Sequence, residues 1–336
     1  MDDRIIITYC LVDDFCKFCE ESQKKFLAAP GVRMRKPTRV PKITPSEIIT
    51  ILLIYQRSHY KDFRNFYGYF RATYKHFFPN LPTYERFNEL QKRVLYLMML
   101  FLKALLTKDS TEGYIDSTKI DVCHLKRSKR NKVFAEKSAV GYSSIGYFYG
   151  FKLHLVIDIN GNIINATILP GNESDIRPVE KLLKNFKGAI FGDKGYISKK
   201  LFENLLKNGT KLVTKIKKNM KDQAMIWREK VLLGKRSLIE SVFNILKNEL
   251  ELVHSRHRCI TNFYIHIMTV LIAYQISPKN IIYQRMSCLS LIHDSRSSRC
   301  VSISRSPTLY LSLIIFGRSS IPTRSEISVF ILLYRF

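Results

Sequence analysis

Residues 114–123 read YIDSTKIDVC, and at this stretch the chain changes from helical to extended patterning. β-Branched and aromatic residues alternate with polar ones here, as they do in half-buried strands. Two further extended runs follow at Gly146–Asp158 and Asn162–Leu169, and a turn at Asn160-Gly161 joins them. The sequence therefore predicts three consecutive antiparallel strands.

The chain after Leu169 alternates helical and extended patterns. It predicts, in order, a helix through Val179, Leu182 and Leu183, a strand at 189–191, a helix at 198–207, a strand at 211–216 and a long helix at about 235–250. The order β-β-β-α-β-α-β-α is the one expected of a ribonuclease-H-like fold, which is an α/β class with a mixed sheet. We therefore predict such a domain over residues 109–284.

The segment ahead of this domain is patterned as helices up to about Thr107. Thr44 or Ser46 is expected to cap a helix that starts near Glu47. Between positions 57 and 78, aromatic residues alternate with lysine and arginine, a combination that can hold a sugar–phosphate backbone, although most of the rings are expected in the core. We predict an all-α, DNA-binding domain of four or five helices over residues 1–108.

The composition of the chain changes again near its carboxyl end. Lysine is frequent up to Lys279 and then absent, whereas serine and arginine crowd the stretch Arg285–Phe336. We interpret residues 285–336 as an atypical tail, foreign to the domain before it, that arises from read-through or a frameshift. Deleting the tail is expected to leave folding and DNA binding intact.

The charge of the chain indicates a polyanionic partner. Lysine and arginine number 55 against 28 aspartates and glutamates, which gives a formal net charge of +27 over 336 residues. Such a field attracts nucleic acid, although a merely basic protein would show the same balance. The hydrophobic content of 46% is enough for a sizeable core, so a disordered chain is excluded.

Targeting signals and cysteine usage both favour a cytoplasmic protein. Asp2 and Asp3 precede a short apolar run at the amino terminus, unlike the positive start of a secretory signal. The apolar run Leu95–Leu106 is shorter than the roughly 20 residues that span a bilayer, so it is expected to be a buried helix. Seven scattered cysteines form no disulfide framework, and the Cys16–Cys19 pair is expected to be core rather than a metal site.

Two acidic residues lie where an α/β site would form. Asp116 lies inside the first predicted strand, where an unpaired carboxylate is costly unless a cation compensates it. Asp193 follows the strand at 189–191, in the sequence GDKGY, at the carboxyl end of a strand where α/β active sites collect. Converging carboxylates of this kind can hold two Mg²⁺ ions for phosphodiester cleavage.

A third acidic residue, Glu240, lies in the long helix predicted at about 235–250. Positions 236, 240, 243 and 247 share one face of an ideal helix, so Arg236 and Lys247 flank Glu240. An acid between two cations suits a metal ligand beside groups that bind phosphate. A surface salt-bridge ladder is the alternative, because Arg236 and Glu240 are four residues apart.

Several other polar residues are weaker candidates. The cations Lys126, Arg127, Lys129 and Arg130 lie in a basic loop that either follows backbone phosphates or is simply solvated. His124 and His154 are expected to be structural hydrogen-bonding residues. Three further aspartates have local explanations, in that Asp158 opens a turn, Asp175 caps the next helix and Asp121 faces away from Asp116.

These motifs resemble a known family. The stretches YIDST (114–118), GDKGYIS (192–198) and Arg236-x₃-Glu240-x₆-Lys247 look like the three acidic blocks of bacterial insertion-sequence DDE transposases, and the wider text is most similar to the IS982 family. Further matching text includes FYGFKLHL (148–155), LPGN (169–172), TKIKKNM (214–220) and HSRHR (254–258). The resemblance covers roughly residues 10 to 280, and one departure is Leu233, where the related signature has tyrosine.

The resemblance implies a function and a set of roles. Asp116, Asp193 and Glu240 would be both the catalytic residues and the ligands of two Mg²⁺ ions, which Mn²⁺ can replace, while Arg236 and Lys247 would hold phosphate oxygens. The enzyme would cut double-stranded DNA at the element's terminal inverted repeats and join the ends to target DNA. Pairing of two ends implies at least a dimer, in a bacterial cytoplasm and on the nucleoid, with no membrane partner.

Two rival interpretations stay open from the sequence. The first is a structure-selective nuclease on the same fold that cuts DNA and never joins it. The second is a decayed, catalytically inactive remnant that still binds DNA, and the atypical tail favours it. The three acidic residues, all present in this sequence, favour an active enzyme over the remnant.

Overall fold

The computed structural model describes residues 2–27, 42–58, 60–143, 146–215, 226–253 and 257–277. The predicted tail at 285–336 lies outside these ranges. The amino-terminal part contains α1 (Asp2–Leu27), α2 (Pro45–Gln56), α3 (Phe63–Thr73), α4 (Tyr84–Leu90), the 3₁₀ turn η1 (Gln91–Val94) and α5 (Leu95–Leu105). The remainder contains β1 (Glu112–Cys123), η2 (Leu125–Arg130), β2 (Ala139–Ser143), β3 (Gly146–Asp158), β4 (Ile163–Pro170), α6 (Val179–Leu182), β5 (Gly188–Gly192), η3 (Lys194–Tyr196), α7 (Lys199–Lys207), β6 (Thr210–Thr214), α8 (Trp227–Gly234), α9 (Ser237–Asn244), η4 (Ile245–Glu249) and α10 (Ile260–Gln275).

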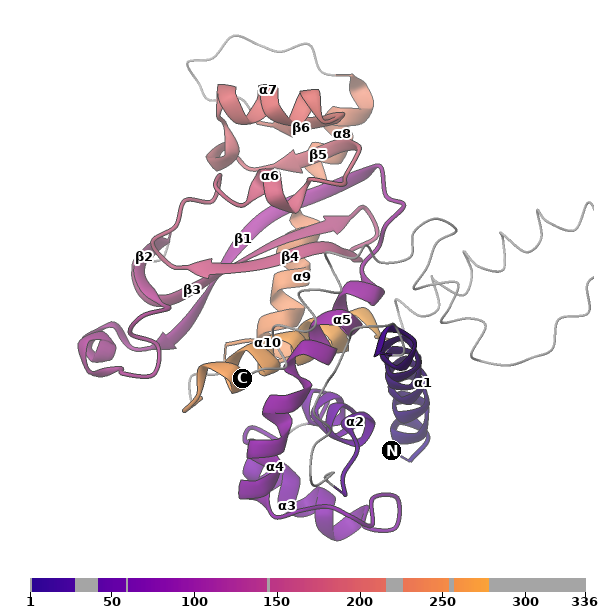
Figure 1. Ribbon diagram of the computed structural model, residues 1–336. Coiled ribbons are helices and arrows are strands. Elements are labelled where there is room, and N and C mark those ends of the chain that lie inside the picture. Colours follow the sequence, from indigo (N-terminus) through magenta and orange to yellow (C-terminus); the bar gives the residue numbers. More distant parts are fainter. Residues whose placement is uncertain are drawn as a thin grey trace, which may run out of the picture.

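The strands form one mixed sheet with β1 and β3 at its centre (Figure 1). The hydrogen-bonded order is β2-β3-β1-β5-β6, and β4 also pairs with β3. β3 pairs antiparallel with β1, β2 and β4, whereas β1–β5 and β5–β6 are parallel. The predicted run of three antiparallel strands is confirmed, and the chain is a mixed α/β protein.

The structure adds one strand that the sequence pattern did not predict. β2 is only five residues long, and it pairs with the start of β3 rather than standing as a separate extended run. The basic segment predicted as a loop between β1 and β2 contains the short 3₁₀ helix η2. The long helix predicted at about 235–250 is also divided, because α9 passes into the π-helical turn η4 at Ile245.

Helices cover both faces of the sheet with separate apolar clusters. One face carries Ile115, Val156 and Ile190 against α6 and α7. The opposite face carries Tyr114, Leu155 and Phe191 against α9 and α10, and this cluster continues into the amino-terminal helices. Successive strand residues point to opposite faces, so Asp116 faces α9 while Ser117 faces the loop before α6.

Helix α2 has one of the two caps that the sequence predicts, whereas α1 begins at Asp2, eleven residues before the helical pattern predicted from Asp13. Thr44 caps α2 by accepting from the backbone N–H of Glu47, whose side chain accepts from the Thr44 N–H in return. Ser46, the alternative cap, instead donates to Asp13 of α1 at 2.8 Å. Most rings of this region are buried, as expected, and Phe66, Tyr67 and Phe70 of α3 are among them.

Helix α10 joins the amino-terminal helices to the sheet. It packs against α5 and α2, and its last residue, Gln275, is 1% exposed. The Gln275 amide donates to the carbonyl of Leu105 at 2.9 Å, while its oxygen accepts from the N–H of Ile163 in β4 at 3.1 Å. The boundary predicted at 108/109 therefore crosses a continuous core, and its standing as a domain boundary stays a prediction.

Within the described ranges, no helix combines the length and the apolar character needed to cross a membrane. The apolar run at 95–106 forms α5, with Met98, Phe101 and Leu102 buried as predicted. Cys16 is 3% exposed within α1, and burial raises the pKa of its thiol to about 11. This thiol is therefore protonated at neutral pH.

Candidate active site

Asp116 and Asp193 lie at the same level of two neighbouring parallel strands. Tyr114 of β1 pairs with Phe191 of β5, and each aspartate is two residues beyond that pair. Adjacent strands are separated by roughly 4.8 Å, so the register brings the two carboxylates to one edge. Asp193 directly follows β5 and precedes η3, which confirms its predicted place at the carboxyl end of a strand.

Arg236 joins Asp116 to Glu240. One guanidinium nitrogen lies 2.9 Å from Oδ2 of Asp116, and the other lies 3.0 Å from Oε1 of Glu240. The arginine and aspartate side chains are 20% and 23% exposed, whereas that of Glu240 is 59% exposed. The ion pair four residues apart on the helix is thus present, but it extends to the sheet and is not merely a surface ladder.

The electrostatic surroundings of Asp116 support the same grouping. Burial raises the pKa of the Asp116 carboxyl, the Ser117 N–H and the Arg236 charge partly offset that effect, and the negative charge of Asp193 raises the pKa again. The Ser117 N–H donates to Oδ1 of Asp116 at 2.8 Å. A partly buried carboxylate that is repelled by a neighbouring exposed carboxylate is arranged as a ligand of a shared cation would be.

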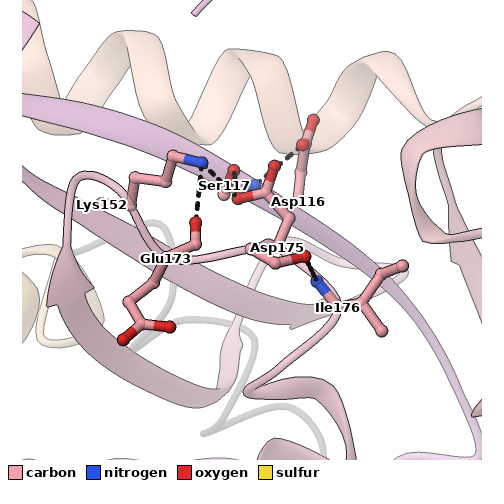
Figure 2. Close-up of polar contacts among 7 residues, drawn as sticks. Asp116, Ser117, Lys152, Glu173, Asp175 and Ile176 are labelled. Carbon is pink, nitrogen blue, oxygen red and sulfur yellow. Dashed lines mark hydrogen bonds and ion pairs between the residues drawn. The ribbon is translucent and has the colours of Figure 1, made fainter. Parts of the chain in front are cut away.

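A second polar group supports β1 from its other face (Figure 2). Ser117 donates to Oδ1 of Asp175 at 3.1 Å, and Lys152 of β3 lies 3.1 Å from the same oxygen. The Lys152 ammonium also donates to the carbonyl of Glu173 at 3.1 Å. The prediction that Asp175 caps the next helix is wrong, because α6 has no side-chain cap and Asp175 turns back to the sheet.

Tyr196 is a buried residue that sequence reasoning did not single out. It lies in the motif GDKGY and is 2% exposed. Burial raises the pKa of this phenol, and the charges of Asp116 and Asp175 raise it further. Its position in the same short motif as Asp193 was the available signal.

Lys247 lies on the π-helical turn η4, after the helix that carries Glu240. Burial lowers the pKa of its ammonium group, the positive charge of Lys119 lowers it further, and Asp121 opposes both. The ideal-helix stripe that predicted its place is interrupted, because the wider turn at η4 changes the phase of the residues after it. The structure thus brings Arg236 to Glu240, and no contact of Lys247 with either residue is present in the described ranges.

The basic residues Lys126, Arg127, Lys129 and Arg130 are all exposed on η2. They follow the end of β1, and the seven residue-to-residue steps from Asp116 to Cys123 span roughly 23 Å at about 3.3 Å per step. These cations are therefore distant from the carboxylates. Their predicted DNA contact belongs to a separate surface.

The remaining candidates have structural explanations, with one exception. Asp158 accepts from the backbone of Asn160 and Asn162 in the turn it opens, as predicted. His124 caps η2 by accepting from the Lys126 N–H. His154 is fully buried with neither ring nitrogen hydrogen-bonded, so the prediction of a structural hydrogen bond is wrong for this residue.

The donor set suits a hard divalent cation. Carboxylate oxygens are the ligands that Mg²⁺ and Mn²⁺ prefer, and Asp116 carries the buried, mutually repelled negative charge that such an ion would relieve. As the side chains lie, however, no three acidic, histidine or cysteine groups of the described ranges gather around one point. The guanidinium of Arg236 stands between Asp116 and Glu240 instead.

Comparison with known proteins gives one match to a family model, over part of the chain. Residues 107–260, just under half of the chain, match a family model described as a transposase DDE domain. Among solved structures, the chain is similar to a piggyBac transposase in a synaptic complex with hairpin DNA, at 11% identity and a TM-score of 0.45, over 96% of this chain and 87% of that one. Similarity that low transfers neither fold nor function, and none of the curated proteins matches the chain.

Proposed function

We infer that the chain is a DNA transposase, because residues 107–260 match a transposase DDE domain and enclose Asp116, Asp193 and Glu240. The observation that carries this proposal is the convergence of two elements on Asp116. Asp193 lies at the level of Asp116 through the β1–β5 register, and Arg236 bridges Asp116 and Glu240. A DDE transposase needs three acidic groups in one place, and these are the three in the expected order along the chain.

The finer assignment is a ribonuclease-H-like, IS982-type enzyme. The motif text around the three acidic residues supports the IS982 family. The mixed sheet, with three antiparallel strands followed by two parallel ones, supports a ribonuclease-H-like domain. Double-stranded DNA with terminal inverted repeats is then the substrate, and at least a dimer acts on two ends. A bacterial cytoplasm, on the nucleoid, is the corresponding location.

Asp116, Asp193 and Glu240 are the residues that would hold two Mg²⁺ or Mn²⁺ ions. Bound there, the ions would lower the pKa of a water or 3′-hydroxyl nucleophile and neutralise charge on the phosphate. The chain's own residues prepare the place. Burial and the nearby Asp193 destabilise the ionised form of Asp116, and Ser117 fixes its orientation through the backbone N–H.

Arg236 has two successive tasks in this proposal. In the structure, the positive charge of its guanidinium partly neutralises the negative charges of Asp116 and Glu240. With the carboxylates held by cations, the N–H donors of Arg236 would be available to bind non-bridging phosphate oxygens bidentately, which a lysine could not do. Lys247, whose pKa burial lowers, would supply a second, point-like charge to the DNA backbone.

The test is cleavage and joining of a labelled duplex that carries the element's terminal repeats, with Mg²⁺ or Mn²⁺. The wild type is compared with Asp116→Asn, Asp193→Asn and Glu240→Gln, which keep side-chain size and remove charge. We expect the wild type to cut and join, and each variant to bind DNA and do neither. Mn²⁺ binding, followed by electron paramagnetic resonance without DNA, should weaken in all three variants.

Two outcomes would favour the rival functions. Cleavage without any joined product would indicate a nuclease on the same scaffold. A wild type that binds DNA but is as inert as its variants would indicate a decayed, DNA-binding remnant. Unchanged cleavage in Asp116→Asn would overturn the site assignment itself.

A further inference from the structure

Two tyrosines lie side by side on the solvent face of the β2–β3 hairpin. Tyr142 pairs with Tyr147 in the antiparallel register, and the two rings are 5.1 Å apart at an interplanar angle of 66°. They are 64% and 69% exposed, among the largest exposures of any apolar side chain in the described ranges. Paired aromatic rings in water are uncommon without a partner, because each leaves a large apolar area unburied.

The hairpin does not need these rings for its own packing. Strand alternation places Gly141 and Phe148 on the opposite face, where Phe148 is 3% exposed. Val140, on the same face as Tyr142, is also 45% exposed. The outer face of this hairpin is therefore an aromatic surface that the fold itself leaves uncovered.

Exposed cations lie at the same end of the sheet as this aromatic surface. Between His124 and Ser143 the chain has six cations, all exposed, against the single acid Glu136. The cations are Lys126, Arg127, Lys129, Arg130, Lys132 and Lys137. Four of them lie on η2, which contacts β3, so the cations and the rings share one end of the sheet (Figure 1).

This composition selects the kind of partner. A cationic surface repels a basic partner, disfavours the apolar interior of a membrane, and attracts phosphate groups. Exposed rings add little on a closed duplex, whose bases are stacked on one another. On an unpaired strand, however, each base offers a face, and stacking on an aromatic ring contributes about 1–3 kcal/mol per base.

We propose that the Tyr142–Tyr147 pair and the η2 cations form a binding surface for an unpaired DNA strand. The rings stack on bases while the cations hold the phosphates on either side. The surface is distinct from the carboxylate site, from which Asp116 to Cys123 of β1 separates it. The proposal rests on the proposed function only in taking DNA as the substrate.

The experiment measures affinity for labelled single-stranded oligothymidine and for a duplex of the same length, with the full chain and no divalent cation. The variants are Tyr142→Ala/Tyr147→Ala, Tyr142→Phe/Tyr147→Phe, and Lys126→Gln/Arg127→Gln/Lys129→Gln/Arg130→Gln. The alanine pair should weaken single-strand binding about tenfold or more and leave duplex binding unchanged. The phenylalanine pair should retain both affinities, because its rings still stack.

The glutamine variant should weaken both affinities and flatten their salt dependence, because it removes phosphate contacts of either form. Circular dichroism should show unchanged folding, since all the substituted side chains are exposed. Equal losses on single strands and duplex for the alanine pair, or no loss on either, would overturn the proposal. So would a dimer of the free protein that the alanine pair dissociates, because the rings would then belong to an interface between copies. Because no divalent cation is present, these results do not depend on whether the chain cleaves DNA.

Discussion

Arg236 is the residue on which the geometry of the site depends. Its guanidinium touches a carboxylate of β1 and a carboxylate of α9, so it fixes the distance between two elements that lie 120 residues apart in the chain. A lysine at this position could form an ion pair with either acid. Only the planar guanidinium of arginine, with its several N–H donors, can pair with both acids at once. In the structure, Arg236 therefore positions these two carboxylates.

The variants Arg236→Lys and Arg236→Gln test two properties of Arg236: that it orients the carboxylates, and that its guanidinium occupies the place of a cation. We expect cleavage to fall by about 10–100-fold in both variants, the size of effect typical of groups that orient metal ligands. Mn²⁺ binding without DNA should tighten in Arg236→Gln, because no cation then competes for Asp116 and Glu240. Weaker Mn²⁺ binding in that variant would show that Arg236 does not occupy the place of the ion.

His154 should make stability depend on pH. Burial lowers the pKa of its imidazole to about 4, below the value of about 6.5 in an unfolded chain. Between these two pH values the imidazole is protonated in the unfolded state and neutral in the folded state. The free energy of unfolding therefore decreases as the pH falls from about 6.5 to 4. The loss attributable to this group is on the order of 3 kcal/mol, at about 1.4 kcal/mol for each pKa unit.

The measurement is urea unfolding at several pH values for the wild type and His154→Leu. The variant should lose less stability between pH 6.5 and 4, and it should be no less stable at pH 7, because it removes two unpaired buried nitrogens. His76→Gln, at an exposed position, is the matched control and should keep the wild-type slope. Parallel pH profiles for His154→Leu and the wild type would contradict this account.

At the scale of elements, regular patterning made much of the fold predictable. The alternation in β1 and β3 and the acid directly after β5 gave the strands and the level of Asp116 and Asp193. β2 was not predictable, because it is only five residues long and Tyr142 is exposed. It therefore lacks the alternation of buried apolar and exposed polar residues that indicates a strand. The division of the long helix at η4 was missed because an ideal period assumes one uninterrupted helix.

Long-range polar contacts were the least predictable part of the site. Asp175 precedes a helical pattern, so local rules favour a cap, but Ser117 and Lys152 of two distant strands reach it instead. Likewise, nothing local shows that His154 will be buried without partners. Both outcomes depend on which residues the sheet brings together, and spacing along the chain does not contain that information.

Gly188 should be essential for the β1–β5 pairing. Its φ is +133°, and a Cβ there would lie 1.9 Å from the carbonyl oxygen of Thr111, which accepts from the N–H of Ala189. Gly188→Ala should lower the free energy of unfolding by at least about 1–3 kcal/mol, the usual cost of a strained backbone conformation. It should also displace Asp193, so the rate of DNA cleavage should fall as well. Gly68→Ala in α3 meets no atom within 4 Å, and it should leave stability equal or raise it by up to about 1 kcal/mol. Thermal unfolding of both variants measures the contrast; similar melting temperatures would refute it.

At the scale of the whole molecule, the amino-terminal helices and the sheet share one core. The cluster on the α9 face continues through α10 into α2 and α5, and Arg57 of the amino-terminal part donates to the carbonyl of Ala273 in α10 at 2.6 Å. Removing residues 1–108 would expose most of the buried face of α10. The two parts are therefore expected to unfold together.

Two deletions test this expectation. A chain without residues 1–108 should bind hydrophobic dyes and unfold without a cooperative transition, because α10 loses its apolar partners. A chain without residues 285–336 should unfold cooperatively, as the wild type does, and keep its affinity for DNA. A cooperative transition in the first deletion would establish residues 109–284 as an autonomous domain, and a loss of cooperativity in the second would show that the tail is part of the fold.

The double hydrogen bond of Gln275 also has a consequence for the order of events on the ribosome. The carbonyl of Leu105 and the N–H of Ile163 both bond to the side chain of Gln275. This side chain is synthesised 170 residues after Leu105 and 112 residues after Ile163. Synthesis proceeds from the amino terminus, and contacts so distant in sequence form slowly. Until Gln275 emerges, the apolar surfaces of α5 and β4 that α10 later covers are exposed to solvent. Nascent chains of this protein should therefore bind ribosome-associated chaperones until α10 docks, and should release them once α10 covers these surfaces; crosslinking of stalled nascent chains of different lengths would measure this.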